Sequence, residues 1–311
     1  MATKTRIELQ ESGVIFDEDE HTYELNGKYL SGITEMLQRQ LFPNEYDGIP
    51  MAIIKKAGEY GKSVHKSCED FDSLWKNDGT QEVQDYIQIC SDNNLVHEAS
   101  EYNVSDGENW ASNIDKVYRE NDDTFSLGDL KTYGVMTPDK LEKTRWQLSI
   151  YAYLFELQNK KAKVDRLFVI RLRNKMKKDG SFDHISEIVF VDRIPSEICK
   201  ELLDTDLKGE QFVNPYSIPE SIKAQEEHIL ELILTKEAVD AELSQIKSSI
   251  LTQMEEKQIR TWITQKMRIT RKLPTTRTSL NLPLLKEEHP EIDYDYYMKS
   301  TTVSGSLSIA V

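Results

Sequence analysis

The chain has 311 residues, of which 38% are hydrophobic and 30% charged, with a formal net charge of −15 at pH 7. This composition favours a water-soluble protein with one sizeable core and an appended module, and no apolar run approaches the roughly 20 residues needed to cross a bilayer. Three scattered cysteines suggest neither a disulfide framework nor a zinc ribbon, and they are too few for a four-thiolate iron–sulfur cluster. The N-terminus lacks a signal-peptide core, so we expect a cytoplasmic protein without a membrane partner.

The N-terminal part predicts a β-hairpin and then helices. Residues 21–25 and 28–30 are two short strand-like runs on either side of Asn26-Gly27. Asparagine and glycine tolerate the positive φ angles of a type I′ turn, so this pair is a strong hairpin signal. A long helix is expected from about residue 51 to residue 75, and it carries His65.

Two strand-like runs with acidic residues follow. Asp115 lies in the run 113–118, and a polar turn then leads to a second strand with Asp129, Leu130 and Lys131. Successive side chains of a strand point to opposite faces, so Asp129 and Lys131 project to one side while Leu130 packs on the other. We therefore expect two carboxylates and one lysine to converge.

Two carboxylates at neighbouring strand positions can hold Mg²⁺, which keeps several waters and takes further ligands from substrate phosphate. A lysine beside the metal can orient or help deprotonate the attacking water. The pattern thus favours phosphoryl chemistry. The alternative is an ordinary ion pair on an exposed strand, because a lone Asp-x-Lys is common.

The core continues with a helix and a buried strand. Thr137 and Pro138 supply an N-cap and a first-turn proline. Gln147 and Tyr151 are four residues apart on that helix and share a face. Residues 164–173 read as a buried strand that turns back on a further strand. Helix, three strands, helix and strand together predict an α/β core.

Two prolines near residues 215–219 predict a boundary between a domain of residues 1–215 and a C-terminal part of residues 216–311. That part is expected to hold a long amphipathic helix and a small α/β module. The helix shows apolar residues at heptad-like spacing: Ile229, Leu232, Val239, Leu243, Ile246 and Ile250. Its expected role is packing on the body of the protein or on a partner helix.

The negative net charge argues against a nucleic-acid partner, but the charges are unevenly distributed along the chain. Two basic stretches could line a DNA track, or could be ordinary solvated faces. The first consists of Lys160, Lys161, Lys163, Arg166, Arg171, Arg173, Lys175, Lys177 and Lys178. The second consists of Arg260, Lys266, Arg268, Arg271, Lys272 and Arg277.

These motifs resemble the RecB-like and lambda-exonuclease-like branch of the PD-(D/E)XK nuclease superfamily. The resemblance is carried by segments in the family's order: Gly61 to His65, Glu101, Ile114-Asp115, Asp129 to Thr132, and Gln147 to Tyr151. It departs from many relatives at Asn113, where they have glycine. The C-terminal module is similar to that of phage nucleases related to the YqaJ-type viral recombinases, through residues 276–279, 285–290 and 304–307.

The resemblance implies a restriction-endonuclease-like α/β core, with a central mixed sheet flanked by helices, and a role for each matched residue. Asp115 and Asp129 would ligate metal, joined by His65 and Glu101; Lys131 would assist the attacking water; Gln147 and Tyr151 would support the site and contact DNA. The metal would be Mg²⁺, with Mn²⁺ as a substitute.

The implied activity is hydrolysis of DNA phosphodiesters by an exonuclease that resects ends in phage-type recombination, with a single-strand annealing protein as partner, in the cytoplasm of a bacterial host. A homo-oligomer is compatible with this reading. Two alternatives stay open: a structure-specific endonuclease with the same metal site, and a non-catalytic DNA-binding or scaffold protein with a nuclease fold.

Overall fold

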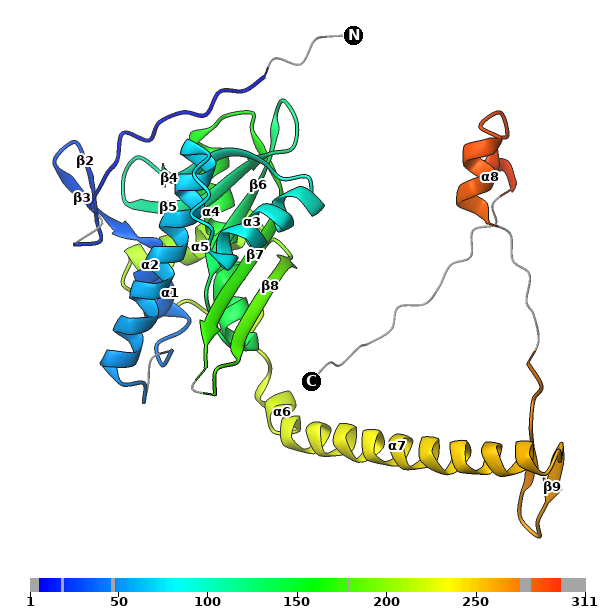
Figure 1. Ribbon diagram of the computed structural model, residues 1–311. Coiled ribbons are helices and arrows are strands. Elements are labelled where there is room, and N and C mark those ends of the chain that lie inside the picture. The colour runs from blue at the N-terminus through cyan, green and yellow to red at the C-terminus, as the bar shows by residue number, and fades with distance from the viewer. Residues whose placement is uncertain (1–5, 18–19, 46–47, 178, 275–280, 298–311) are drawn as a thin grey trace. The chain divides into compact units, whose positions relative to one another are not determined.

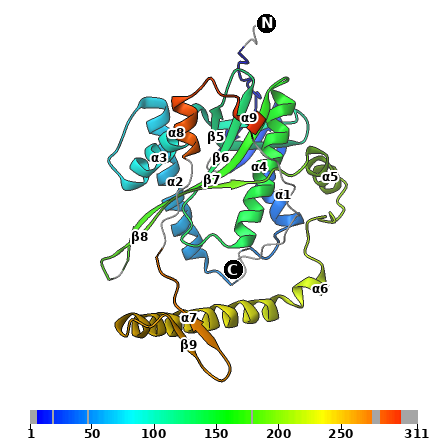
Figure 2. The same ribbon diagram turned by 90° about the vertical axis from the view of Figure 1, so that its right-hand side faces the viewer.

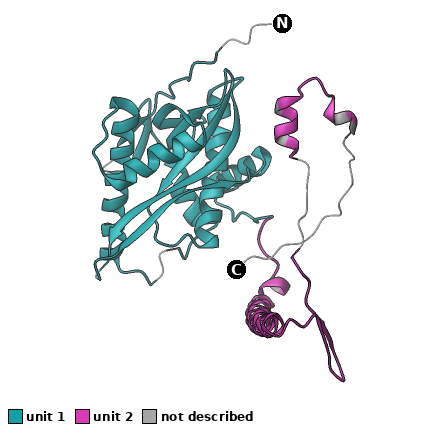
Figure 3. Ribbon diagram, turned by 45° about the vertical axis from the view of Figure 1, so that its right-hand side comes forward, with its two compact units in different colours: residues 1–215 teal, residues 216–311 magenta. Residues whose placement is uncertain are grey.

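The computed structural model (Figure 1) describes residues 6–17, 20–45, 48–177, 179–274 and 281–297. The chain divides into two compact units, Met1–Pro215 and Tyr216–Val311 (Figure 3). The division falls at the first of the two prolines near which the sequence pattern breaks.

The first unit is built on one mixed β-sheet. Its strand order is β1-β2-β3-β5-β6-β7-β8, and β4 pairs with β5 beside this path. The β3–β5 and β6–β7 pairs are parallel and the others are antiparallel. The strands are β1 Ile15–Asp17, β2 Thr22–Leu25, β3 Lys28–Gly32, β4 Val96–Ser105, β5 Trp110–Arg119, β6 Thr124–Lys131, β7 Lys163–Met176 and β8 Phe182–Val191.

Helices cover both faces of the sheet (Figure 2). Side chains alternate along β7, so that Leu167 and Val169 join the core with α1, α4 and α5, while Phe168 and Ile170 join the core with α2 and α3. The helices are α1 Ile33–Gln40, α2 Met51–Leu74, α3 Gln81–Asp92, α4 Pro138–Gln158 and α5 Ser196–Leu207. The predicted α/β architecture with a mixed central sheet flanked by helices is therefore confirmed.

Local sequence signals explain several element ends. The β2–β3 hairpin turns at Asn26 and Gly27, which have φ angles of 52° and 82°. The helix expected over residues 51–75 forms as α2. α4 begins as expected at Pro138, and the Thr137 side chain accepts a hydrogen bond from the Lys140 N–H at 3.4 Å. Helix α3 was not predicted from the sequence, although its buried Val83, Tyr86 and Ile89 recur every three residues.

The second unit contains the long helix that the heptad pattern predicted. It consists of α6 Glu220–Lys223, α7 Glu226–Glu256, the antiparallel pair β9 Thr261–Ile263 and β10 Arg268–Thr270, α8 Leu282–Glu288 and α9 Tyr294–Tyr297. Residues 276–279 and 304–307, which carry part of the resemblance to the viral recombinases, lie outside the described residues. Across the described part of the chain, no helix combines the length and apolar character needed to span a membrane.

Candidate metal centre

The site lies where two central strands separate. β6 pairs with the end of β5, and the last pair of this ladder is Lys116 opposite Gly128. Beyond this pair, the backbone N–H of Leu130 on β6 donates a hydrogen bond of 2.8 Å to the Oδ2 atom of Asp115 on β5. A side-chain carboxylate therefore takes up a backbone donor just beyond the end of the ladder, which satisfies that buried N–H.

Three acidic residues occupy neighbouring positions on β4, β5 and β6. Extending the β5–β6 register by one residue places Asp129 opposite Asp115. On the other edge of β5, the β4 pairs that flank Glu101 place Glu101 opposite Asp115 as well. The topology therefore brings carboxylates from three consecutive strands to one place, as the sequence predicted for Asp115 and Asp129.

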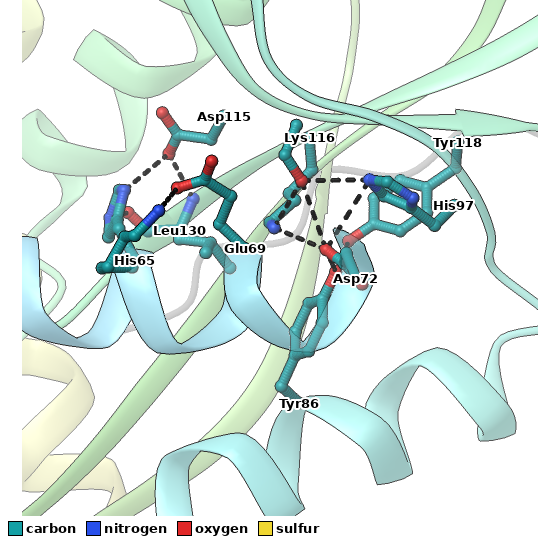
Figure 4. A network of polar contacts seen from close by, with 11 residues as sticks. His65, Glu69, Asp72, Tyr86, His97, Asp115, Lys116, Tyr118 and Leu130 are labelled. Atoms are coloured by element: carbon teal, nitrogen blue, oxygen red, sulfur yellow. Dashed lines mark hydrogen bonds and ion pairs between the residues drawn. The ribbon is translucent and has the colours of Figure 1, made fainter. Parts of the chain in front are cut away.

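His65, Glu101 and Asp115 form a cluster that can hold a metal ion. One ligand atom from each of the three lies within 4.8 Å of the others. His65 Nε2 lies 2.9 Å from the Leu130 carbonyl oxygen. A carbonyl oxygen can only accept, so in neutral imidazole Nε2 carries the proton and Nδ1 carries a lone pair. Nδ1 of this neutral form faces Asp115 Oδ2 at 3.7 Å (Figure 4), so a cation between the two atoms would meet one acceptor on each side.

Asn113 holds the Glu101 carboxylate. Its Nδ2 donates a hydrogen bond of 2.8 Å to Glu101 Oε2. Glu101 has a φ of 49°, which is rare for a residue other than glycine and marks a strained position. The Asn113 Oδ1 atom is buried and has no hydrogen-bond partner among the described residues. Asn113 thus supplies a side chain that orients one candidate ligand.

Asp129 and Lys131 form an ion pair beside this cluster. The two groups lie 2.7 Å apart, and Asp129 is 1% exposed. Burial raises the pKa of Asp129. The Lys131 charge opposes this increase, and the Asp115 charge adds to it. Burial lowers the pKa of Lys131, but Asp129, Tyr133 and Asp115 together raise it more, so that the pKa lies above its ordinary value. Lys131 is therefore an ammonium here, and Asp129 lies outside the three-residue cluster.

Gln147 and Tyr151 lie on α4. The Gln147 Nε2 atom donates a 2.6 Å hydrogen bond to the Tyr151 hydroxyl, and Tyr151 is buried. The expected roles of both residues, support of the site and contact with DNA, stay predictions. Tyr23 on β2 also lies near Glu101 and Asp115, and no pattern in the sequence indicates this. Burial raises the pKa of Tyr23 to about 12, interactions with Ser112 and the Asn113 backbone lower it, and the nearby carboxylates of Glu101 and Asp115 raise it.

A second polar network lies next to the candidate metal centre (Figure 4). Lys116 follows Asp115 on β5, and its Nζ lies 2.5 Å from Asp72 Oδ2 on α2 and 2.8 Å from the Ser100 hydroxyl. The Tyr86 hydroxyl donates to the same Asp72 oxygen at 2.8 Å. Because Asp72 lies seven residues after His65 on one helix, this network ties α2 to β5 about two helical turns from the histidine.

A cleft of about 450 Å³ opens beside His65 and Lys131. One wall is apolar and comes from the start of α2 and the segment before it, including Ile49, Ile53 and Ala57. Its cationic lining consists of Lys131, Lys140, Arg173 and Lys175. The cleft can therefore receive an anion that also carries an apolar surface.

The basic stretches are partly neutralised. On β7, Arg166 pairs with Glu120, Arg171 with Glu187 and Arg173 with Asp183. In the second unit, Arg271 lies 3.7 Å from Glu255. Of the first stretch, Arg173 and Lys175 reach the cleft. A DNA track along these stretches therefore has fewer free charges than the sequence suggested.

No protein-family model matches this chain, and neither does any curated protein. Among solved structures, the crystal structure of SSO0001 is similar to it at 12% sequence identity and a TM-score of 0.32, over 60% of this chain and 78% of that one. A TM-score this low does not establish a shared fold.

Proposed function

We propose that this chain is a Mg²⁺-dependent deoxyribonuclease of the PD-(D/E)XK type, RecB-like and lambda-exonuclease-like, and that it resects DNA ends as an exonuclease. One observation carries the proposal. Glu101, Asp115 and Asp129 lie side by side on three strands where the β5–β6 ladder ends, with the Lys131 ammonium 2.7 Å from Asp129. Carboxylates on adjacent strands with a lysine beside them suit phosphodiester hydrolysis.

The donor set fits a hard divalent cation. Glu101, Asp115 and the unprotonated Nδ1 of His65 would hold the metal, and Asp129 would contribute from the neighbouring strand. Carboxylate ligands suit Mg²⁺ and Mn²⁺, and an imidazole is better tolerated by Mn²⁺. When bound, such an ion supplies Lewis acidity at the phosphate and lowers the pKa of a coordinated water.

The remaining side chains would bind and orient the substrate. As an ammonium, Lys131 donates hydrogen bonds and can fix a water molecule or a phosphate oxygen, but it has no lone pair with which to remove a proton. The cations of the cleft lie beside the acidic row. Local positive charge can attract a polyanion to a protein whose total charge is negative. In the cell, we propose a single-strand annealing protein as the partner in recombination.

The test uses linear duplex DNA labelled separately at each 5′ end, together with a closed circular duplex. Purified wild type is incubated with Mg²⁺ or Mn²⁺ beside Asp129→Asn, Asp115→Asn and a matched control, Asp165→Asn, which changes an exposed carboxylate of β7. Calorimetric titration of Mn²⁺ into each protein measures metal binding independently of cleavage.

We expect wild type and Asp165→Asn to degrade the linear duplex, spare the circle and bind Mn²⁺, while the two site variants lose cleavage. Nicking of the circle would move the assignment to an endonuclease. DNA binding without cleavage of either substrate would refute the nuclease and support the scaffold alternative.

A further inference from the structure

The long helix α7 carries an apolar seam that the described residues of the second unit leave largely exposed. The seam residues follow one another along the helix at alternating intervals of three and four residues: Ile229, Leu232, Lys236, Val239, Leu243, Ile246 and Ile250. Leu232, Val239, Leu243 and Ile246 are exposed by 44–55% of their surface. Among the described side chains of α7, the one that is buried is Met254, near the C-terminal end of the helix. Apolar side chains exposed in a row usually mark a surface that meets another protein.

The spacing identifies the kind of partner. A strict three-four repeat places every seam residue on the line along which two supercoiled helices meet, with Ile229, Lys236, Leu243 and Ile250 at a positions and Leu232, Val239 and Ile246 at d positions. The seam runs for three heptads, the length at which a coiled coil becomes a reasonable inference. A sheet or a flat protein surface would not need this repeat.

The charges beside the seam favour a second copy of the same helix in parallel. In that pairing each g position faces the e position five residues later on the partner, so Glu242 of each helix meets Lys247 of the other. The other pairs of this type that lie within the seam, Thr235 with Asp240 and His228 with Ile233, place no like charges together. Most other acidic residues of the helix occupy outward positions.

Lys236 defines the register. A single lysine at an a position lowers coiled-coil stability but specifies alignment and oligomer state, because any shift would bury the charge against other layers. Its aliphatic stem can lie in the seam while its ammonium reaches water. DNA is a poor occupant of this helix, which has eight acidic and two basic residues.

We propose that this protein is a homodimer in which α7 of each copy forms a parallel two-stranded coiled coil through the seam from Ile229 to Ile250. This surface is separate from the candidate metal centre, and the proposal stands whether or not the protein cleaves DNA. The chain mass is 36.0 kDa, so the dimer has twice that mass.

Sedimentation velocity and light scattering on the full chain test the self-association. We expect wild type to sediment as a dimer and Leu243→Glu to be monomeric, with self-association weakened at least tenfold. The matched control is Ser244→Glu, which adds the same charge one residue later at an outward position and should remain dimeric. A monomeric wild type would overturn the proposal, and so would a dimer that Leu243→Glu leaves intact.

Disulfide crosslinking tests the parallel direction. Leu232→Cys places a thiol in the seam near one end of the helix, so that mild oxidation should link the two copies of a parallel dimer. Glu231→Cys at an outward position, and wild type with its own Cys68, Cys90 and Cys199, should stay unlinked. A dimer that dissociates with Leu243→Glu but does not crosslink through Leu232→Cys would overturn the parallel arrangement.

Discussion

Lys116 Nζ lies 2.5 Å from Asp72 Oδ2, and the two side chains are 1% and 5% exposed. This buried ion pair joins α2 to β5 at the residue next to Asp115. Burying two charges is costly, and hydrogen bonds with Ser100 and Tyr86 accompany the pair. The network therefore fixes how the histidine-bearing helix lies on the strand that carries the candidate ligand.

We expect Lys116→Met to lower the free energy of unfolding by about 3–5 kcal/mol, because it leaves the Asp72 charge buried without its cation. Urea unfolding followed by the fluorescence of the buried Trp110 and Trp146 measures this in the first unit. Adding Asp72→Leu should recover most of the loss. Lys66→Met, which removes an exposed ion pair on α2, should leave the midpoint nearly unchanged. Equal midpoints for Lys116→Met and Lys66→Met would contradict the prediction.

Asn113→Ala should weaken Mn²⁺ binding by about 10–100-fold, the usual effect of removing a group that orients a metal ligand. The cause is loss of the 2.8 Å hydrogen bond to Glu101. Calorimetry at constant pH measures the affinity. Asn44→Ala changes an exposed asparagine of the same unit and serves as the control. Unchanged affinity in Asn113→Ala would show that Glu101 needs no such support.

Glu101→Gly should make the protein more stable and a weaker metal binder. Glycine adopts the φ of 49° without the steric cost that other residues carry there, so we expect a gain of about 1 kcal/mol in the free energy of unfolding. Glu101→Ala removes the same carboxylate but keeps the strain, and should lose Mn²⁺ affinity without the gain. Urea unfolding and Mn²⁺ titration of both variants decide the matter: equal stability would mean that the backbone at residue 101 is not strained.

The ion pair between Glu98 and Arg119 should give an acid-sensitive part of the stability. Hydrogen bonds from Arg119 lower the pKa of Glu98 below its usual value, against the opposing effect of burial. A carboxyl with a lower pKa in the folded state stabilises the protein above the unfolded pKa of about 4.3, and this stabilisation is lost as the pH falls through the folded value. The difference in urea midpoint between wild type and Glu98→Gln should be full at pH 7 and shrink below about pH 4. A difference that stays constant over that range would speak against the ion pair.

Features set by neighbouring residues could be predicted from the sequence. The hairpin at Asn26 and Gly27 and the start of α4 at Thr137 depend on local backbone preferences, so a short segment suffices. The convergence of Asp115 with Asp129 required one further step, a single turn between two strands. Each of these inferences spans few residues, and the structure contains each arrangement.

Contacts that depend on strand register or on distant segments could not be predicted. Glu101 comes opposite Asp115 only because the register of β4 shifts between His97 and Ala99, and no local pattern announces that shift. Asp72 and Lys116 are 44 residues apart. The ion pair of Arg171 in the basic stretch could not be read from the sequence, because its partner Glu187 lies opposite it on the next strand, across the β7–β8 ladder.

The hydrogen bond from His65 Nε2 to the Leu130 carbonyl has a further consequence. It holds the imidazole ring in one rotamer and one tautomer as soon as α2 packs on β6. The rotational freedom that a flexible ligand would lose upon capturing an ion is therefore lost during folding instead. A cation that enters between His65 and Asp115 meets a coordinating nitrogen already aimed at it, so its affinity depends on how firmly the helix is seated on the sheet.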